Sequence, residues 1–363
     1  MNNSAKITKD TKKKIHADYE GKMDWKKRIF IKLTSKAFLI DVVWAIVRFI
    51  LLLGIAFVVV YPFFVKISSS FMSASDFKDV TVKMIPKTPT LSTYSTVITE
   101  NEYFKALGNT FLLSLLCAVV QMFISAFVGY GFAKFKFKGS KILFLFVILA
   151  MVIPHDTLQL SLFMKFRYFD VYGIYAFFHA MFDGSMASSG GLFAWLKGAI
   201  EGYKATASIQ LNGTYWPLFI LSLGGLAFKN SLYIFLMRQY FRGVPDELEE
   251  AAYIDGSGPF QTYIKIILPI SVPMLITVFL FAFSWQWTDN FYTDLFYTSS
   301  GPTLMTDIVQ IPKTLDTSFA GGTMYSTAII NTCGMLIIAP LIIIYVFAQK
   351  YIIQGIERSG ITG

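Results

Sequence analysis

Six long apolar stretches, separated by polar connections, dominate the pattern of this chain. They cover about residues 42–65, 107–130, 142–163, 216–237, 270–291 and 326–347. A helix needs roughly 20 apolar residues to cross about 30 Å of hydrocarbon, and each stretch is long enough. Backbone polar groups cannot stay unpaired in lipid, so each stretch is expected to be helical. The pattern therefore predicts an all-α integral membrane protein with six transmembrane helices.

The composition agrees with a membrane location. Of the 363 residues, 55% are hydrophobic and only 15% are charged, whereas soluble domains carry about 25% charged residues. The two cysteines, Cys117 and Cys333, both lie inside apolar stretches, so the sequence predicts no disulfide framework. The formal net charge of +9 is better explained by membrane topology than by nucleic-acid binding, because the positive residues gather in short connections.

The positions of lysine and arginine predict the orientation of the helices. Cytoplasmic connections are enriched in these residues. They cluster before the first apolar stretch, at 131–141, after the fourth stretch and after the sixth, whereas the connection 292–325 has only Lys313. With six crossings, all of the basic clusters fall on one side. We therefore expect both termini to be cytoplasmic.

The remaining segments complete the predicted organisation. Residues 1–41 are read as a basic cytoplasmic segment whose end, at 24–40, forms an amphipathic helix in the membrane interface. Residues 42–350 would form the transmembrane domain and 351–363 a cytoplasmic tail. Residues 66–106 are predicted to be a polar external loop long enough to touch a partner.

An unusual insertion at about 171–210 separates the third and fourth stretches. It combines an aromatic run with glycine and serine breakers, followed by apolar residues at helical spacing. We expect a short external helix there. Two additional crossings, formed by 172–182 and 192–203, are the alternative, and they would leave the later topology unchanged.

The connection at 243–269 has the pattern of a helix, a glycine turn and a second helix. Pro245 and the acids after it suit a first helical turn, where amide groups lack partners and negative charge is favoured. Gly256 is expected to end the first helix, because glycine readily adopts the left-handed conformation of a helix C-terminus. Pro269 marks the entry to the fifth apolar stretch.

This connection also carries a recognisable motif. Glu250-Ala251-Ala252 is followed after three residues by Gly256 and, after nine more, by an Ile-x-Leu-Pro sequence ending at Pro269. The pattern resembles the cytoplasmic coupling loop of the membrane subunits of ATP-binding-cassette (ABC) importers. Further segments resemble the second of two paired permeases in maltose-type carbohydrate importers, namely 130–139, 238–250, 283–291 and 349–355. The resemblance covers roughly 50–363, apart from the insertion.

The resemblance implies a type I ABC importer permease fold in the plasma membrane and a role in oligosaccharide uptake. It also implies partners: a second permease in a heterodimer, two ABC ATPase subunits, an extracytoplasmic solute-binding protein and membrane lipid, with no nucleic acid. Glu250 would meet a basic residue of the ATPase, and the C-terminal tail would reach between the ATPase subunits. The implied ATPase-coupling residues are Glu249, Glu250, Ala251, Ala252, Asp255 and Gly256.

No catalytic or cofactor chemistry is predicted. The chain lacks a glycine-rich phosphate loop, so ATP hydrolysis is expected on another chain. Its three histidines, His16, His155 and His179, are dispersed and form no metal or nucleophile motif. Two alternatives stay open: an ABC permease for a non-sugar solute, and an autonomous secondary transporter. The latter usually shows internal repeats, and none is evident here.

Polar residues within apolar stretches mark a candidate substrate pathway. Tryptophan offers a flat face for a sugar ring, although it can equally be an interfacial anchor. If Lys229 faces the pathway, its charge favours an anionic glycan such as a uronate. If its side chain instead extends to the membrane interface, it implies nothing about the substrate. His155 and Asp156 form either a titrating pair or part of a kink at Pro154. The candidates are Asp156, Gln159, Lys229, Trp285, Trp287, Asp289, Asn290 and Asn331.

Overall fold

The computed structural model describes residues 36–170, 209–297 and 301–360. These residues are helical or irregular, apart from one antiparallel bridge between Phe169 and Ile209. Most of the predicted interfacial helix at 24–40 and nearly all of the insertion at 171–210 lie outside the described residues. The chain divides into two compact units, 1–68 and 69–363.

The first unit contains one long helix, α3 (Lys36–Ser70). Its segment Ile40–Ser70 is long and apolar enough to cross a membrane. Large apolar side chains such as Phe57 and Val58 are exposed along it, as expected for a surface that faces lipid. The first predicted span is therefore present as a single helix.

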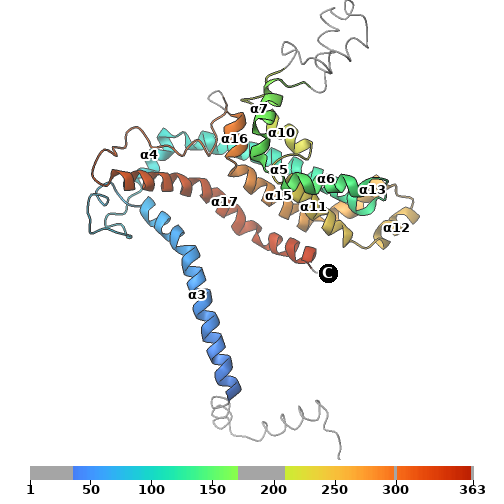
Figure 1. The fold of residues 1–363 in the computed structure, drawn as a ribbon, viewed down its shortest axis with the longest axis horizontal. Coiled ribbons are helices and arrows are strands. Elements are labelled where there is room, and N and C mark those ends of the chain that lie inside the picture. The colour runs from blue at the N-terminus through green and yellow to red at the C-terminus, as the bar shows by residue number, and fades with distance from the viewer. Residues whose placement is uncertain (1–35, 171–208, 298–300, 361–363) are drawn as a thin grey trace, which may run out of the picture. The chain divides into compact units, whose positions relative to one another are not determined.

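The second unit is a helical assembly arranged around α5 (Figure 1). The α5 helix packs against α10, α11 and α15, and α15 packs in turn against α17. The helices are α4 (Ser92–Glu100), α5 (Tyr103–Lys134), α6 (Ser140–Val152), the 3₁₀ helix η1 (His155–Leu158), α7 (Gln159–Arg167), α10 (Trp216–Leu223), α11 (Asn230–Arg242), α12 (Glu247–Ile254), α13 (Pro259–Thr262), the π-helix η4 (Tyr263–Ile267), α14 (Leu268–Ile270), α15 (Val272–Trp287), α16 (Phe291–Phe296) and α17 (Gly322–Gly360).

The predicted spans are only partly continuous. Within the described residues, three helices could each cross a membrane: Ile40–Ser70, Tyr103–Lys134 and Gly322–Ile353. Two further spans are bent pairs: Ser140–Val152 with His155–Arg167 at 98°, and Pro259–Ile270 with Val272–Trp287 at 78°. Up to five spans are thus present, and the predicted number of six is not confirmed.

The predicted fourth span, 216–237, is interrupted. Helix α10 ends at Leu223 and α11 begins only at Asn230. In the break, Gly225 and Lys229 have left-handed backbone, with φ of +71° and +62°. Hydropathy averaged over a window does not register such a break, because the intervening residues are themselves largely apolar.

The end of α5 opposite α12 is tied to the loop before α17. The amide Nδ2 of Asn101 donates hydrogen bonds to the carbonyls of Ile308 and Gln310, both at 2.8 Å. The Thr110 hydroxyl accepts one from the Met305 amide at 2.8 Å. These contacts join segments about 200 residues apart in the sequence and give this end of the helix a defined surface.

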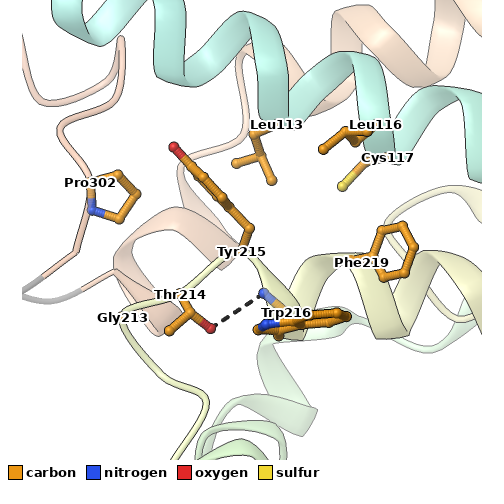
Figure 2. Close-up of a pocket in the computed structure, with 9 residues that line it drawn as sticks. All are labelled: Leu113, Leu116, Cys117, Gly213, Thr214, Tyr215, Trp216, Phe219 and Pro302. Carbon is orange, nitrogen blue, oxygen red and sulfur yellow. Dashed lines mark hydrogen bonds between the residues drawn. The ribbon is translucent and has the colours of Figure 1, made fainter.

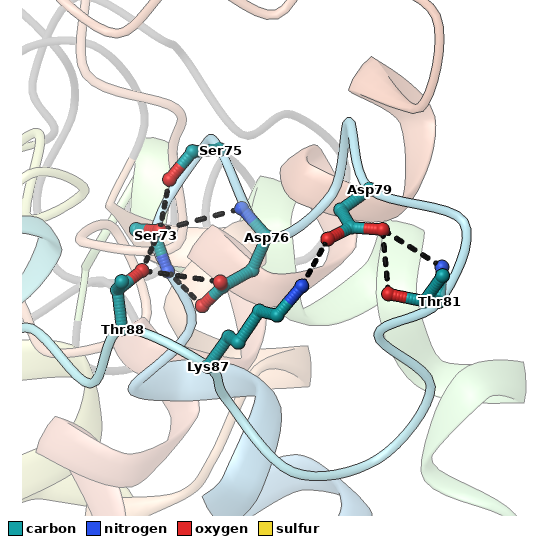
Figure 3. Close-up of polar contacts among 7 residues, drawn as sticks. All are labelled: Ser73, Ser75, Asp76, Asp79, Thr81, Lys87 and Thr88. Carbon is teal, nitrogen blue, oxygen red and sulfur yellow. Dashed lines mark hydrogen bonds and ion pairs between the residues drawn. The ribbon is translucent and has the colours of Figure 1, made fainter.

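The predicted loop at 66–106 is internally ordered and contains helix α4. Buried Asp76 accepts hydrogen bonds from the Ser73 amide at 3.2 Å and from the Thr88 hydroxyl at 3.1 Å (Figure 3). Nearby, Lys87 Nζ contacts the Asp79 carboxylate at 2.7 Å. The segment therefore holds a shape of its own through side-chain contacts.

Candidate functional site

Helix α12 forms the first half of the predicted coupling loop. It ends as expected at Gly256, whose φ is +84°. The Gly256 amide donates to the Tyr253 carbonyl at 3.0 Å, and the Ser257 amide donates to the Ala252 carbonyl at 2.9 Å. This pair of bonds satisfies the last carbonyls of a helix that ends in a left-handed residue. The predicted order of helix, glycine turn and helix is confirmed.

The six predicted coupling residues divide between two faces. Glu249 and Ala252 are buried against the rest of the protein. Their spacing of three places them on one helical face. The other four are exposed and form the outward surface of α12 and its turn: Glu250, Ala251, Asp255 and Gly256.

Lys134, at the end of α5, holds the beginning of α12 in place. Its ammonium donates to the Val244 carbonyl at 2.6 Å and to the Asp246 carboxylate at 2.5 Å. The Lys134 side chain is 6% exposed, whereas that of Asp246 is 78% exposed. The hydrogen bond from Lys134 lowers the pKa of Asp246. Lys134 therefore fixes the start of α12 to the end of α5, and this set of contacts is called the Lys134 clamp below.

This role of Lys134 is not predicted from the sequence, in which it is one of four lysines that indicate a cytoplasmic connection. Its place in the basic-aromatic segment 130–139 is the one available signal, and that segment is a motif separate from the predicted coupling loop. Only the folded chain brings the two segments together.

Beyond Gly256, the loop continues through α13, η4 and α14 into α15. Tyr263, in η4, packs on Tyr130 of α5 with ring centroids 4.8 Å apart, and Tyr130 also contacts Phe241 of α11 at 5.5 Å. Segments of π-helix are rare and frequently mark functional sites. The loop is thus packed against α5 and α11 before it bends into α15.

A second group of residues surrounds the break between α10 and α11. The Lys229 ammonium lies 4.7 Å from the centre of the Phe228 ring and 5.2 Å from that of Trp285. His155 contacts the same Phe228 ring at 4.9 Å, and its Nδ1 lies 2.9 Å from the Tyr292 hydroxyl. Lys229 and Trp285, which the sequence suggested separately, are therefore neighbours.

A cavity of about 360 Å³ adjoins this group. It lies where α6 breaks before Pro154 and where α10 breaks before Lys229. Its polar lining includes His155, Lys229, Ser231 and Tyr292. The sequence does not predict Phe228 and Tyr292 as site residues. Phe228 lies in an apolar stretch and Tyr292 directly after one, and aromatic residues at such positions are equally expected in a core.

The other predicted pathway residues lie apart from this cavity. Trp287 is fully buried and its indole N–H donates to the Ile337 carbonyl at 3.0 Å, so its ring is not available to a sugar. Asp289 is buried and accepts hydrogen bonds from the amides of Tyr292 and Thr293. Asn331 donates to Ser69 at 3.1 Å. The exposed ones are Asp156, Gln159 and Asn290.

A larger cavity of about 560 Å³ lies between α5 and α10 (Figure 2). Leu113, Cys117, Tyr215 and Phe219 contribute to a largely apolar lining, and Figure 2 shows no charged side chain among the residues drawn. The cavity therefore offers little to orient a polar solute, unlike the cavity beside Lys229.

Comparisons with known proteins are consistent with this architecture. Residues 121–358 match the family described as "Binding-protein-dependent transport system inner membrane component". The arabinooligosaccharides transport system permease protein AraQ of Halalkalibacterium halodurans is 26% identical over 313 residues, covering 85% of this chain and 93% of that protein. The galactooligosaccharides transport system permease protein GanQ of Bacillus subtilis is 24% identical over 319 residues, covering 87% and 94%.

A solved structure shares the fold. It is a bacterial ABC transporter involved in the import of the acidic polysaccharide alginate, and one of its chains aligns with a TM-score of 0.60 at 20% identity. The alignment covers 87% of this chain and 98% of that one. Together with the family match over most of the second unit, this shows an ABC permease fold in a multi-pass protein of the cell membrane. The chain belongs to the binding-protein-dependent transport system inner membrane component family.

Proposed function

We propose that this chain is a permease subunit of an ATP-driven importer of oligosaccharides. It would form part of the translocation pathway and couple, through α12, to an ATPase carried by another chain. The names of two relatives, which refer to arabinooligosaccharides and galactooligosaccharides, support a carbohydrate substrate. Family membership supports dependence on a solute-binding protein. A second permease and two ATPase subunits would complete the assembly.

The geometry of α12 is the observation that carries this proposal. The helix exposes Glu250, Ala251 and Asp255 while its other face is buried. At its start, Lys134 connects it to α5, and after Gly256 the chain continues through α13, η4 and α14 into α15. A partner that pushed on α12 would therefore move two helices of the core.

The proposed topology places α12 and both termini in the cytoplasm, as the lysine-rich connections suggest. Residues 1–41 and 351–363 would then flank the transmembrane domain 42–350 on that side. Asp156, Gln159, Asn290 and Asn331 are kept as candidate pathway residues, because polar side chains in spanning segments are functional candidates. Trp287 and Asp289 are better explained by their contacts inside the protein.

Co-purification from native membrane tests the proposal. We expect the unaltered chain to retain a second permease and an ATPase, and Glu250→Ala to lose the ATPase while keeping the second permease. The matched control is Glu102→Ala, because Glu102 is an exposed acid next to the opposite end of α5. It should retain both partners.

Recovery of this chain without an ATPase in mild detergent would contradict the proposal and favour an autonomous transporter. If Glu250→Ala and the control retain the ATPase equally, α12 is not the element that couples this chain to the ATPase. Both results can be read from the same mass spectrum of bound proteins.

A further inference from the structure

Lys229 carries a positive charge whose position is unusual for a residue between two helices. It has a left-handed backbone, with φ of +62°, directly before α11. Residues other than glycine adopt this conformation at an energetic cost, and such strain is concentrated at functional sites. This backbone places Lys229 at the break between α10 and α11, beside the cavity that the break borders.

The ammonium of Lys229 lacks an acidic partner within the described part of the chain. The ammonium instead lies over two aromatic rings, those of Phe228 and Trp285. A partly buried charge in a spanning segment is expensive, and it is normally paired or used to bind a ligand. Cation–π attraction to the two rings lowers the free-energy cost of burying the charge. The ammonium can still form an ion pair with an anionic ligand.

The surroundings of Lys229 have the composition of a sugar site. Trp285 is 46% exposed, so its ring has free surface beside the ammonium. The adjoining cavity of about 360 Å³ falls in the range of about 300–1,000 Å³ that is common for small-molecule sites. Its wall carries hydrogen-bonding groups on His155, Ser231 and Tyr292. A cation and polar groups therefore line one space, and the exposed Trp285 ring lies next to the cation.

We propose that this cavity binds an anionic sugar, with the Lys229 ammonium pairing the sugar carboxylate and the Trp285 ring contacting the sugar face. The inference rests on the proposed function, because it assigns the substrate class of the same pathway. Lys229 would act as a selectivity residue: it would favour a uronate over a neutral sugar of equal size. His155, held by Tyr292, would line the space beside it.

Direct binding to the assembled transporter tests this assignment. The complex of this chain with its partner permease and ATPase subunits, in lipid nanodiscs and without solute-binding protein, is titrated calorimetrically with digalacturonate and with galactobiose. The two probes have the same ring framework and differ in charge. We expect digalacturonate to bind at least about tenfold more tightly, equivalent to about 1.4 kcal/mol.

Three variants identify the source of that preference. Lys229→Gln should bring the two probes to equal affinity, and Lys229→Arg should keep the preference because it keeps the charge. Lys105→Gln removes one exposed lysine beside the start of α5 and should leave the preference unchanged. This control separates a local contact from a general effect of net charge.

Several results would overturn the proposal. They are equal affinity for both probes in the unaltered complex, a preference that survives in Lys229→Gln, and no saturable binding of either probe. Loss of the second permease in Lys229→Gln would show that Lys229 forms an ion pair between subunits instead. If the complex assembles and its solute-binding protein still stimulates ATP hydrolysis, any of these failures leaves the transporter function standing.

Discussion

Two adjacent carboxylates in α12 meet different surroundings. Glu249 is 8% exposed, and Oε1 of its carboxylate has no hydrogen-bond partner among the described residues. Glu250 next to it is exposed. Burial raises the pKa of Glu249 above its ordinary 4.5, although the nearby Lys134 opposes the shift. The resemblance implies coupling roles for both residues, but of the two only Glu250 is exposed.

The raised pKa of Glu249 predicts a pH-dependent stability. An acid whose pKa is higher in the folded state favours folding when protonated. That contribution is fully present below pH 4.5, the ordinary pKa of the residue, and is lost as pH rises through the raised value. Glu249→Gln should therefore raise the unfolding midpoint at pH 7, and the gain should shrink towards pH 4.5.

Thermal unfolding of the detergent-solubilised protein at several pH values measures this effect. Glu250→Gln is the matched control, since it makes the same change one residue away at an exposed position. Its unfolding midpoint should follow that of the unaltered protein. A constant difference between Glu249→Gln and the unaltered protein across this pH range would contradict the prediction.

At the scale of elements, close helix packing and helix breaks define the second unit. Gly129 of α5 lies against α11, where a Cβ atom at this position would come within 2.7 Å of the Met237 Cβ and 2.9 Å of the Arg238 amide. Gly131, two residues further along the same helix, has no such neighbour within 4 Å. The two glycines therefore have different roles, although both lie in α5.

This difference predicts opposite effects of the same substitution. Gly129→Ala forces α5 and α11 apart, and overpacking of this kind costs about 1–3 kcal/mol. Gly131→Ala adds a methyl group to open space, and alanine is favoured over glycine in a helix interior by about 0.8–1.0 kcal/mol. Thermal unfolding should show a lower midpoint for the first variant and an equal or higher one for the second. An unchanged midpoint for Gly129→Ala would contradict the close contact of α5 and α11 at Gly129.

At the scale of the whole molecule, α5 connects α12 with the loop before α17. The helix has 32 residues and is therefore about 48 Å long. Near one end, Asn109 and Thr110 contact the loop before α17, and at the other end Lys134 holds α12. The proposed orientation puts the first end outside the cell and the second in the cytoplasm.

Cysteine labelling tests this orientation. Val80 is 92% exposed in the loop before α4, and Ile254 is 85% exposed at the end of α12. We expect a membrane-impermeant maleimide to label Val80→Cys in intact cells and Ile254→Cys only after permeabilisation. The native Cys117 and Cys333 are buried and should give little background. Labelling of Ile254→Cys in intact cells would invert the proposed topology.

Much of the helical content could be predicted from the chain alone. The first, second and sixth apolar stretches are continuous helices in the described residues, and Gly256 ends α12 as expected. Local patterns were sufficient here, because hydrophobic length and the backbone freedom of glycine act over a few residues. The prediction of one continuous helix at 216–237 was wrong. Local patterns do not reveal the break before Asn230, because it lies within a stretch of apolar and small residues.

The candidate site was predictable only in part. Lys229 and Trp285 are both predicted pathway residues, because they are polar or amphipathic residues of spanning segments. Nothing in the sequence shows that they are neighbours. Trp287 is predicted for the same reason as Trp285, only two residues away. The structure buries Trp287 and leaves Trp285 exposed. Helical rotation separates the two rings, and which one faces the core depends on how α15 packs against its neighbours.

The sequence by itself determined the membrane location, the helical class and the coupling-loop motif, because these depend on composition and on short-range order along one segment. The tertiary structure decided which residues are neighbours: the Lys134 clamp on Asp246, the burial of Glu249 beside exposed Glu250, and the meeting of Lys229 with Trp285. Such contacts join segments 50 to more than 100 residues apart. They follow from helix breaks and packing between elements, which no local pattern encodes.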